Sequence, residues 1–429
     1  MPLRVSVTAL GCKVNYAEMA DLAGRLAAAG CEVVAEEDPA DVRVLNTCTV
    51  TVAADATSRQ RLRRLRRADP DAHIVVTGCS VDGNPQIYLR GDDRGPAVLP
   101  AGVDAVFANA TKDRIALHVL AMAAGRDSVA ANPTVAPLRS RAFIKVQDGC
   151  NHRCTYCSVW RARGASRSLP RADIRARVAA AVNSGHGELV LTGVDLGAYG
   201  RAHGSSLAQL VRILLDDVGT RARIRLSSVN TNDITAELVD LNAHSQLCSH
   251  WHMPLQSGSD TVLRAMHRGY RRDQYLRVCA ALRRLDADTE FTTDVMVAFP
   301  GETEADHADT LALLEETEML AAHTFRYSPR DDTPAALRGD RIDEASARRR
   351  SADVRRTAAA TGHARRARAV GSRQEVVWDR VDGGLAHGVS ATYLSVVASA
   401  TPGARAGGMA TVEVEAVDGD VLRARVVDR

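Results

Sequence analysis

Short apolar strand patterns alternate with helical patterns over roughly the first 125 residues. The alternation predicts strands at residues 4–10, 41–45 and 73–77, with helices at 18–29 and 58–67. Alternation of this kind favours a parallel sheet covered by helices. We therefore expect an N-terminal parallel α/β domain over residues 1–125.

The middle of the chain, residues 138–345, repeats the same alternation with longer helical stretches. Strands are predicted at 143–147, 188–192, 223–227, 250–254, 291–297 and 322–325, and helices at 171–183, 206–217 and 304–316. Six strand–helix units occupy fewer residues than the roughly 250 typical of an eight-stranded barrel. This pattern predicts a partial (βα)6 barrel, separated from the first domain by a Pro-containing linker.

The C-terminal part of the chain has a different pattern. An arginine-rich, helix-like stretch over 341–373 precedes five short strand segments punctuated by glycine, at 375–378, 385–389, 393–397, 409–414 and 421–427. Five short strands are typical of a small barrel of the kind that binds nucleic acids. We expect this all-β domain over residues 365–429.

The composition is that of a globular protein: 429 residues, 45% hydrophobic and 25% charged, with a net charge of +3. Apolar runs fall short of the roughly 18–20 residues of a membrane span, and the N-terminus lacks the pattern of a secretory signal. We therefore expect a cytoplasmic protein that does not associate with membranes. Nine cysteines in such a compartment favour metal or redox chemistry over disulfides.

Three of the cysteines, Cys150, Cys154 and Cys157, form a C-x3-C-x2-C motif directly after a predicted strand. Three thiolates can hold three irons of a [4Fe–4S] cluster and leave the fourth iron open. A zinc site with His152 as fourth ligand is the alternative, although the C-x-H-x-C spacing is poor for zinc.

A second trio is spread along the chain. Cys12, Cys48 and Cys79 each lie just past a predicted strand of the first domain. If these strands are parallel neighbours, their carboxyl ends share one edge of the sheet, where ligands bind in open α/β folds. The sequence therefore predicts a second three-thiolate site, against the alternative of three buried core cysteines.

Together, two three-cysteine sites followed by a small β-barrel resemble the methylthiotransferase family of radical S-adenosylmethionine (AdoMet) enzymes, over essentially the whole chain. Segments 11–15, 46–51, 146–151 and 191–200 resemble the MtaB branch, which acts on N6-threonylcarbamoyladenosine at position 37 of tRNA. Segments 253–259, 299–303 and 327–330 resemble the whole family. The sequence departs from the family at Val229-Asn230-Thr231, at Ser80-Val81-Asp82-Gly83 and at Ala298, where glycine is usual.

This resemblance implies two [4Fe–4S] clusters and two AdoMet molecules per turnover. One AdoMet would methylate sulfur at the Cys12/Cys48/Cys79 site, and reductive cleavage of the other at the Cys150/Cys154/Cys157 site would activate C2 of the adenine. The C-terminal domain would be an RNA-binding TRAM barrel. The implied partners are the anticodon loop of tRNA and an electron donor such as flavodoxin or ferredoxin, and we expect a monomer.

Further cofactor contacts are expected at the ends of the core strands and beside the third cysteine, with a packing or turn role as the alternative for each. These candidates are Tyr156, Thr192, Gly193, Asp195, Ser227, His252, Gln256 and Asp294. Phosphate contacts are expected from the arginine-rich stretch, with a solvated helix face as the alternative. The candidates there are Arg348, Arg349, Arg350, Arg355, Arg356, Arg365 and Arg366.

Three other functions compete with this hypothesis. Two lie within the same family: methylthiolation of isopentenyladenosine at position 37 of tRNA, and methylthiolation of an aspartate in a ribosomal protein. The third is an iron–sulfur RNA-binding regulator without catalysis, which two open-iron sites make less favoured.

Overall fold

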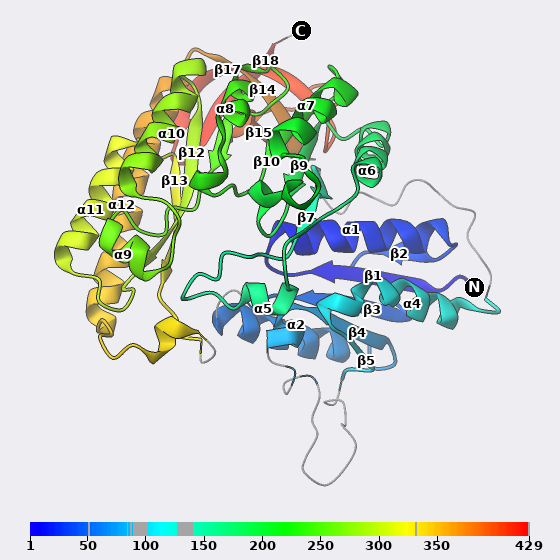
Figure 1. The fold of residues 1–429 in the computed structure, drawn as a ribbon. Helices are drawn as coiled ribbons and strands as arrows, with labels where there is room; N and C mark the ends of the chain where they lie inside the picture. Colours follow the sequence, from blue (N-terminus) through cyan, green and yellow to red (C-terminus); the bar gives the residue numbers. More distant parts are fainter. Residues whose placement is uncertain are drawn as a thin grey trace. The chain divides into compact units, whose positions relative to one another are not determined.

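The computed structural model describes residues 1–49, 52–83, 85, 88, 102–126, 140–330 and 333–427 (Figure 1). The chain forms two compact units. The first comprises Met1–Leu138, Gly149–Asn151 and Cys157–Ala165, and the second comprises Arg139–Asp148, His152–Tyr156 and Ser166–Arg429. The predicted linker around residues 126–137 lies almost wholly outside the described residues. Among the described residues, no helix has the length and apolarity needed to cross a membrane.

The first unit is built on a five-stranded parallel sheet with strand order β2-β1-β3-β4-β5. Its strands are β1 (Arg4–Ala9), β2 (Glu32–Val34), β3 (Val42–Thr47), β4 (His73–Gly78) and β5 (Ala105–Phe107). Its helices are α1 (Lys13–Ala28), α2 (Val52–Ala68), α3 (Cys79–Gly83), α4 (Ile115–Ala123) and α5 (Val159–Arg163). The predicted parallel α/β fold is confirmed, with two additional three-residue strands, β2 and β5.

Alternate residues of this sheet pack against helices on its two faces. Val44 of β3 shares a core with Leu26 of α1 and Val119 of α4. Its neighbour Leu45 packs instead with Leu65 of α2. This two-residue alternation is the geometry of a strand buried on both faces. The central strands are therefore held rigidly, and their carboxyl ends are fixed in space.

The second unit contains two three-stranded sheets, β10-β9-β6 and β11-β12-β13. Isolated parallel bridges between Ser228 and His252 and between Ile224 and Leu247 connect them into one six-stranded parallel layer. Its strands are β6 (Ala142–Lys145), β9 (Glu188–Thr192), β10 (Arg223–Leu226), β11 (His250–His252), β12 (Glu290–Val297) and β13 (Ala321–Arg326). A small ladder joins β7 (Gln147–Asp148) to β8 (Arg167–Ser168). The predicted partial (βα)6 barrel is confirmed.

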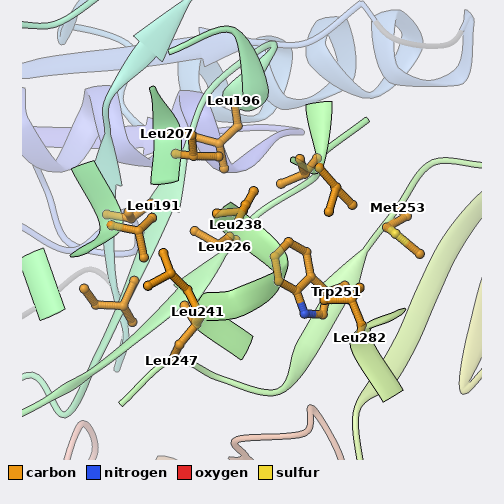
Figure 2. Packing of buried hydrophobic residues seen from close by; sticks show 14 of the residues in the cluster. Leu191, Leu196, Leu207, Leu226, Leu238, Leu241, Leu247, Trp251, Met253 and Leu282 are labelled. Carbon is orange, nitrogen blue, oxygen red and sulfur yellow. The ribbon is translucent and has the colours of Figure 1, made fainter. Parts of the chain in front are cut away.

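Helices cover one face of this six-stranded core. They are α6 (Arg171–Asn183), α7 (Leu207–Val218), α8 (Ala236–Asp240), α9 (Asp260–Ala265), α10 (Arg272–Leu285), α11 (Glu304–Glu316) and α12 (Glu344–Arg368). Leu191, Leu226 and Trp251 pack among leucines of the surrounding segments, including Leu238 and Leu282 (Figure 2). This apolar layer fixes the strands from outside. The alternate residues of each strand form the inner face.

The inner face is polar. Register places Thr292, Asp294 and Met296 of β12 beside residues 321, 323 and 325 of β13. His250 and His252 of β11 lie on the same face, and both contact the Thr292 hydroxyl, at 2.8 and 2.9 Å. The two histidines therefore share one face of the strand layer.

The amino end of the inner face holds a fully buried ion cluster. Glu188 accepts hydrogen bonds from Arg223 at 2.8 Å and from Arg225 at 2.7 Å. Burial alone would raise the pKa of Glu188, but the guanidinium groups of Arg225 and Arg223 outweigh burial and hold that pKa well below its usual range. The remaining N–H groups donate to backbone carbonyls of Val389 and Ser390 at 2.9 and 2.8 Å. Every strong donor of the cluster therefore has a partner.

Those carbonyls belong to a closed five-stranded barrel of order β14-β15-β16-β18-β17. Its strands are β14 (Arg373–Asp382), β15 (Leu385–Ser390), β16 (Ser395–Ser399), β17 (Met409–Asp418) and β18 (Val421–Val427). Tyr393 stacks on His250 with ring centroids 4.2 Å apart, although its backbone lies in the left-handed region at a φ of 72°. The left-handed turn at Tyr393 explains why β16 begins at Ser395 rather than at the predicted residue 393. The predicted small C-terminal barrel is confirmed.

Candidate functional site

The trio Cys12, Cys48 and Cys79 ends three adjacent parallel strands. Cys12 caps α1 after β1, Cys48 follows β3 directly, and Cys79 begins α3 after β4. Because β1, β3 and β4 are neighbours in the sheet, their carboxyl ends meet at one edge. The three strands are therefore parallel neighbours, as the hypothesis of a shared three-cysteine site requires.

Gly11 leaves room for the Cys48 sulfur at this edge of the sheet. Its φ is +84°, and a Cβ atom there would lie 2.4 Å from the Cys48 sulfur. No other residue type tolerates both the backbone conformation and the contact. The Cys48 sulfur therefore lies against the backbone that immediately precedes Cys12.

Two buried cations, Arg163 and Lys112, lie near this group of cysteines. The Nε–H of Arg163 donates to the Cys79 sulfur at 3.2 Å, and Asn109 donates to that sulfur at 3.7 Å. Lys112 and Arg163 both contact Glu18, at 2.6 and 2.8 Å. Burial raises the pKa of Cys12, and the nearby Arg163 opposes that rise.

Glu18 thus faces two buried cations in this cluster, and Asp82 of α3 also interacts electrostatically with both of them. Three cysteines at one edge of the sheet can hold three irons of a [4Fe–4S] cluster. The donor set therefore fits a three-cysteine cluster.

The motif cysteines Cys150, Cys154 and Cys157 follow β6 and β7 in the chain. In the first unit, the Cys150 N–H donates to the Gly164 carbonyl at 3.1 Å. In the second unit, Arg268 donates to the Cys154 sulfur at 3.5 Å. In each trio, therefore, one cysteine sulfur accepts a hydrogen bond from an arginine.

Tyr156, directly before Cys157, is half-buried. It packs against an apolar cluster that includes Met266 and Phe299. The neighbouring Thr155 donates to the Ala265 carbonyl at 2.9 Å. These contacts give the aromatic position a packing role, and its cofactor contact stays a prediction.

His152 lies between two buried carboxylates of the second unit, Asp195 at 3.2 Å and Asp233 at 3.9 Å. The hydrogen-bonding carboxylates of Asp195 and Asp233 raise the pKa of His152 to about 10. Arg201 also pairs with Asp233. The positive charges of His152 and Arg201 balance the negative charges of the two carboxylates.

Asn230 extends this polar network. Its amide donates to Asp195 at 3.1 Å, and its carbonyl oxygen accepts from Arg268 at 2.6 Å. Asn230 occupies the segment in which the sequence departs from the family pattern. The departure therefore lies beside the candidate site rather than at a distance from it.

Thr192 and Gly193 form the end of β9. Thr192 is buried, and its carbonyl accepts from the Val146 N–H at 2.9 Å. A Cβ atom at Gly193 would lie 2.8 Å from the Gln147 amide oxygen, which also accepts from the Asp195 N–H at 2.8 Å. The tight packing makes glycine necessary here and holds the carboxyl end of β9 in place.

Ser227 follows β10 at the carboxyl end of the inner face. It is buried, yet its hydroxyl has no hydrogen-bond partner among the described residues. A buried unsatisfied hydroxyl is costly and asks for an explanation. A polar ligand at this end of the core would supply the partner, which fits the predicted AdoMet contact.

His252, Gln256 and Asp294 come together in the second unit. The His252 ring approaches the Asp294 carboxylate at 3.3 Å. Gln256 accepts a backbone hydrogen bond from Met296 and donates one to Asp294, with its own φ at +64°. Strain of this kind at a non-glycine residue is concentrated at binding sites. Ala298, where the family commonly has glycine, also has a left-handed φ of 58°.

Sequence reasoning missed three residues at these sites: Arg163, Arg268 and Phe325. Phe325 is 37% exposed and pairs in register with Met296 on the inner face. The exposed aromatic is a platform on which a flat base could stack. In an arginine-rich sequence, neither arginine stands out, whereas the rarity of phenylalanine, with five in the chain, was an available signal.

The seven arginines predicted to contact RNA lie on α12, and most are engaged in ion pairs. Arg350 and Arg365 are buried, with carboxylate contacts at 2.7 and 2.8 Å to Glu302 and Glu290. Arg348, Arg349, Arg355 and Arg356 remain exposed, and Arg366 is half-buried beside Asp420. A role in RNA binding stays a prediction for the exposed positions, and the buried pair serves packing.

Comparison with known proteins supports this description. Residues 144–314 match the Radical SAM superfamily, and residues 4–94 match the uncharacterized protein family UPF0004. The chain is 35% identical to the threonylcarbamoyladenosine tRNA methylthiotransferase MtaB of Thermotoga maritima, over 87% of this chain and 86% of that protein. It is 36% identical to the tRNA-2-methylthio-N(6)-dimethylallyladenosine synthase of a Parafrankia strain, over 79% of this chain and 70% of that protein.

A solved structure shares the fold. The radical S-adenosylmethionine methyltransferase TsrM from Kitasatospora setae, with cobalamin and a [4Fe–4S] cluster bound, superimposes with a TM-score of 0.56 at 14% identity. The match covers 79% of this chain and 77% of TsrM. At this level of identity, the likeness is one of architecture.

Proposed function

Since this chain belongs to the methylthiotransferase family of radical AdoMet enzymes, we propose that it adds a methylthio group to C2 of N6-threonylcarbamoyladenosine at position 37 of tRNA. The observation that carries the proposal is the pair of three-cysteine sets. One set ends three adjacent strands beside the buried Arg163, and the other lies in the loop after β7. We propose that each set holds one [4Fe–4S] cluster and that two AdoMet molecules are consumed per turnover.

When bound, the clusters and AdoMet supply the activation of the C2–H bond and the methylthio group, chemistry that side chains alone do not provide. The residues of the chain hold and orient these groups. Cys12, Cys48 and Cys79 would bind one cluster, and Cys150, Cys154 and Cys157 the other. Ser227 would offer its unsatisfied hydroxyl to the polar part of AdoMet.

Two observations support the base as substrate. Phe325 exposes its ring on the inner face, where it would stack on an extruded adenine. The match to this chain covers 86% of the Thermotoga maritima relative but only 70% of the Parafrankia relative. The first relative's name states the threonylcarbamoyl substrate, which favours that base for this chain.

The second candidate is the dimethylallyl (isopentenyl) adenosine at the same position. The identity to the Parafrankia relative is 36%, against 35% to the MtaB of Thermotoga maritima. Identity alone therefore does not separate the two substrates. We also propose that a small electron-transfer protein, such as a flavodoxin or ferredoxin, supplies the electron, and that the enzyme acts as a monomer.

The test is nucleoside mass spectrometry of tRNA from a deletion strain, with and without the gene restored on a plasmid. Loss and recovery of the methylthio mark on threonylcarbamoyladenosine is the expected result. A change confined to the dimethylallyl nucleoside would favour the second candidate. No change in either nucleoside would reject tRNA as the substrate.

The clusters are tested separately on purified, anaerobically reconstituted protein. We expect about eight irons per chain, falling to about four in Cys79→Ala and in Cys154→Ala. Cys79→Ala should still release 5′-deoxyadenosine from AdoMet in the presence of dithionite, whereas Cys154→Ala should not. Four irons in the unaltered protein would contradict the two-cluster proposal.

A further inference from the structure

Helix α5 follows Cys157 and carries a residue that contacts Cys79, all within the first unit. It begins two residues after Cys157 and ends at Arg163, whose guanidinium contacts the Cys79 sulfur. Asn109 ties the same segment down by donating to the Ala162 carbonyl at 3.2 Å. The short helix after one cysteine set thus delivers a cation to the other set.

Arg163 is held in one orientation by every part of its guanidinium group. Its side chain is 1% exposed. Its Nη1 donates to Glu18 at 2.8 Å, its Nη2 donates to Asn15 at 2.6 Å, and its Nε points at Cys79. Both anchors, Asn15 and Glu18, lie on α1 one turn apart. The N–H directed at sulfur is therefore fixed rather than free to rotate away.

A second cation adds to the local charge. Lys112 lies close to the same carboxylate of Glu18 and is itself largely buried, with a side chain 11% exposed. Glu18 and Asp82 both interact with these two cations. The Cys79 sulfur nevertheless receives a directed N–H donor from a buried, positively charged guanidinium, in a medium of low dielectric constant.

Both effects stabilise added negative charge on a cluster. The reduction potential of an iron–sulfur cluster depends on hydrogen bonds to its sulfurs, on charge and on burial. We propose that Arg163 is a positioning residue that raises the reduction potential of the cluster held by Cys12, Cys48 and Cys79. This proposal rests on the proposed function, since it needs a cluster at that site.

The experiment isolates the cluster in the full-length protein by replacing the other set of cysteines with alanine, giving the background C150A/C154A/C157A. About four irons in this background establish that the site holds a cluster. Their absence would overturn the proposed function itself. The midpoint potential is then measured by anaerobic redox titration with electron paramagnetic resonance of the reduced cluster.

In this background, Arg163→Met should shift the midpoint potential to a more negative value, because the donor and the charge are both lost. Arg163→Lys should shift it less, because the charge is kept while the directed Nε–H is lost. The matched control is Arg43→Met. Arg43 is also buried, at 2% exposure, in the same unit, but its N–H groups are directed at Asp69, Ser6 and backbone carbonyls.

A merely structural role for Arg163 predicts a loss of folding stability like that of Arg43→Met, with an unchanged potential. An unchanged potential in a folded, iron-loaded Arg163→Met protein therefore overturns the proposal. If the Arg163→Met protein does not hold iron, the midpoint potential of the Arg163→Lys protein tests the proposal instead. A negative shift in Arg163→Lys supports the proposal, and the absence of a shift rejects it.

Discussion

The two ends of the six-stranded core carry opposite kinds of polar chemistry. At the amino end, Glu188, Arg223 and Arg225 are buried and satisfy one another and the carbonyls of the C-terminal barrel. At the carboxyl end, the Ser227 hydroxyl is buried without a partner among the described residues. The Glu188 cluster completes the fold, whereas the Ser227 hydroxyl is available to a ligand. Hydrogen-bond satisfaction, rather than charge, therefore distinguishes this structural cluster from the candidate ligand contact.

The largest effect should follow from breaking the amino end. Glu188→Ala leaves two arginines buried without their carboxylate, which should cost about 3–5 kcal/mol in the free energy of unfolding. Urea denaturation followed by circular dichroism measures this loss. A loss below about 1 kcal/mol would show that the cluster is not a structural one.

Lowering the pH should test the Glu188 cluster without a substitution. The pKa of Glu188 is lowered in the folded protein, so its ionised form contributes stability above the unfolded value of about 4.3, and that stability is lost as the pH falls further. The linkage slope is at most about 1.4 kcal/mol per pH unit for one group.

The matched variant is Glu188→Gln, which keeps the shape and removes the titration. Compared with the unaltered protein, its unfolding free energy should change less between pH 4.5 and 3. Parallel pH profiles for the two proteins would contradict the assignment of this acid sensitivity to Glu188.

A smaller effect is expected on the inner face near the carboxyl end. Phe325→Ala removes the proposed stacking platform, worth about 1–3 kcal/mol per base. The KM for tRNA should rise roughly tenfold, while release of 5′-deoxyadenosine without tRNA stays unchanged. Phe325→Trp should retain the affinity. If the alanine variant loses the release of 5′-deoxyadenosine instead, the ring serves AdoMet rather than the base.

The smallest effect should come from Ser227→Ala. Removing an unsatisfied hydroxyl should leave the unfolding free energy within about 0.5 kcal/mol of the original. AdoMet should bind about two- to tenfold more weakly to the cluster-loaded protein, since one hydrogen bond is worth about 0.5–1.5 kcal/mol. Isothermal titration calorimetry measures the affinity, and an unchanged affinity would place the ligand elsewhere.

The sequence predicted those features that depend on local pattern. Alternating strands and helices predicted a parallel sheet, and Cys12, Cys48 and Cys79 were placed just past three of its strands. They predicted a shared site on the condition that these strands are neighbours, because parallel strands align their carboxyl ends. The three-residue strands β2 and β5 were missed because three residues carry too little pattern. Local pattern therefore located the cysteines but not every strand around them.

Long-range charge pairing was beyond prediction. Arg350 and Arg365 belong to an arginine-rich helix, but their carboxylate partners Glu302 and Glu290 lie 48 and 75 residues away in the sequence. Arg163 meets Glu18 across 145 residues. A charge run alone does not reveal which of its members have partners, and only the fold assigns them.

The attachment of α12 bears on the proposed binding of tRNA by the C-terminal barrel. Arg350 ties the start of this 25-residue helix to Glu302, and Arg365 ties its end to Glu290. The barrel that follows is joined in turn to the strands through Glu188 and its arginines. The barrel is therefore held in a fixed position relative to the rest of the second unit in the free protein. Binding of tRNA would then not have to order a mobile barrel, and the entropy cost of that ordering would be avoided.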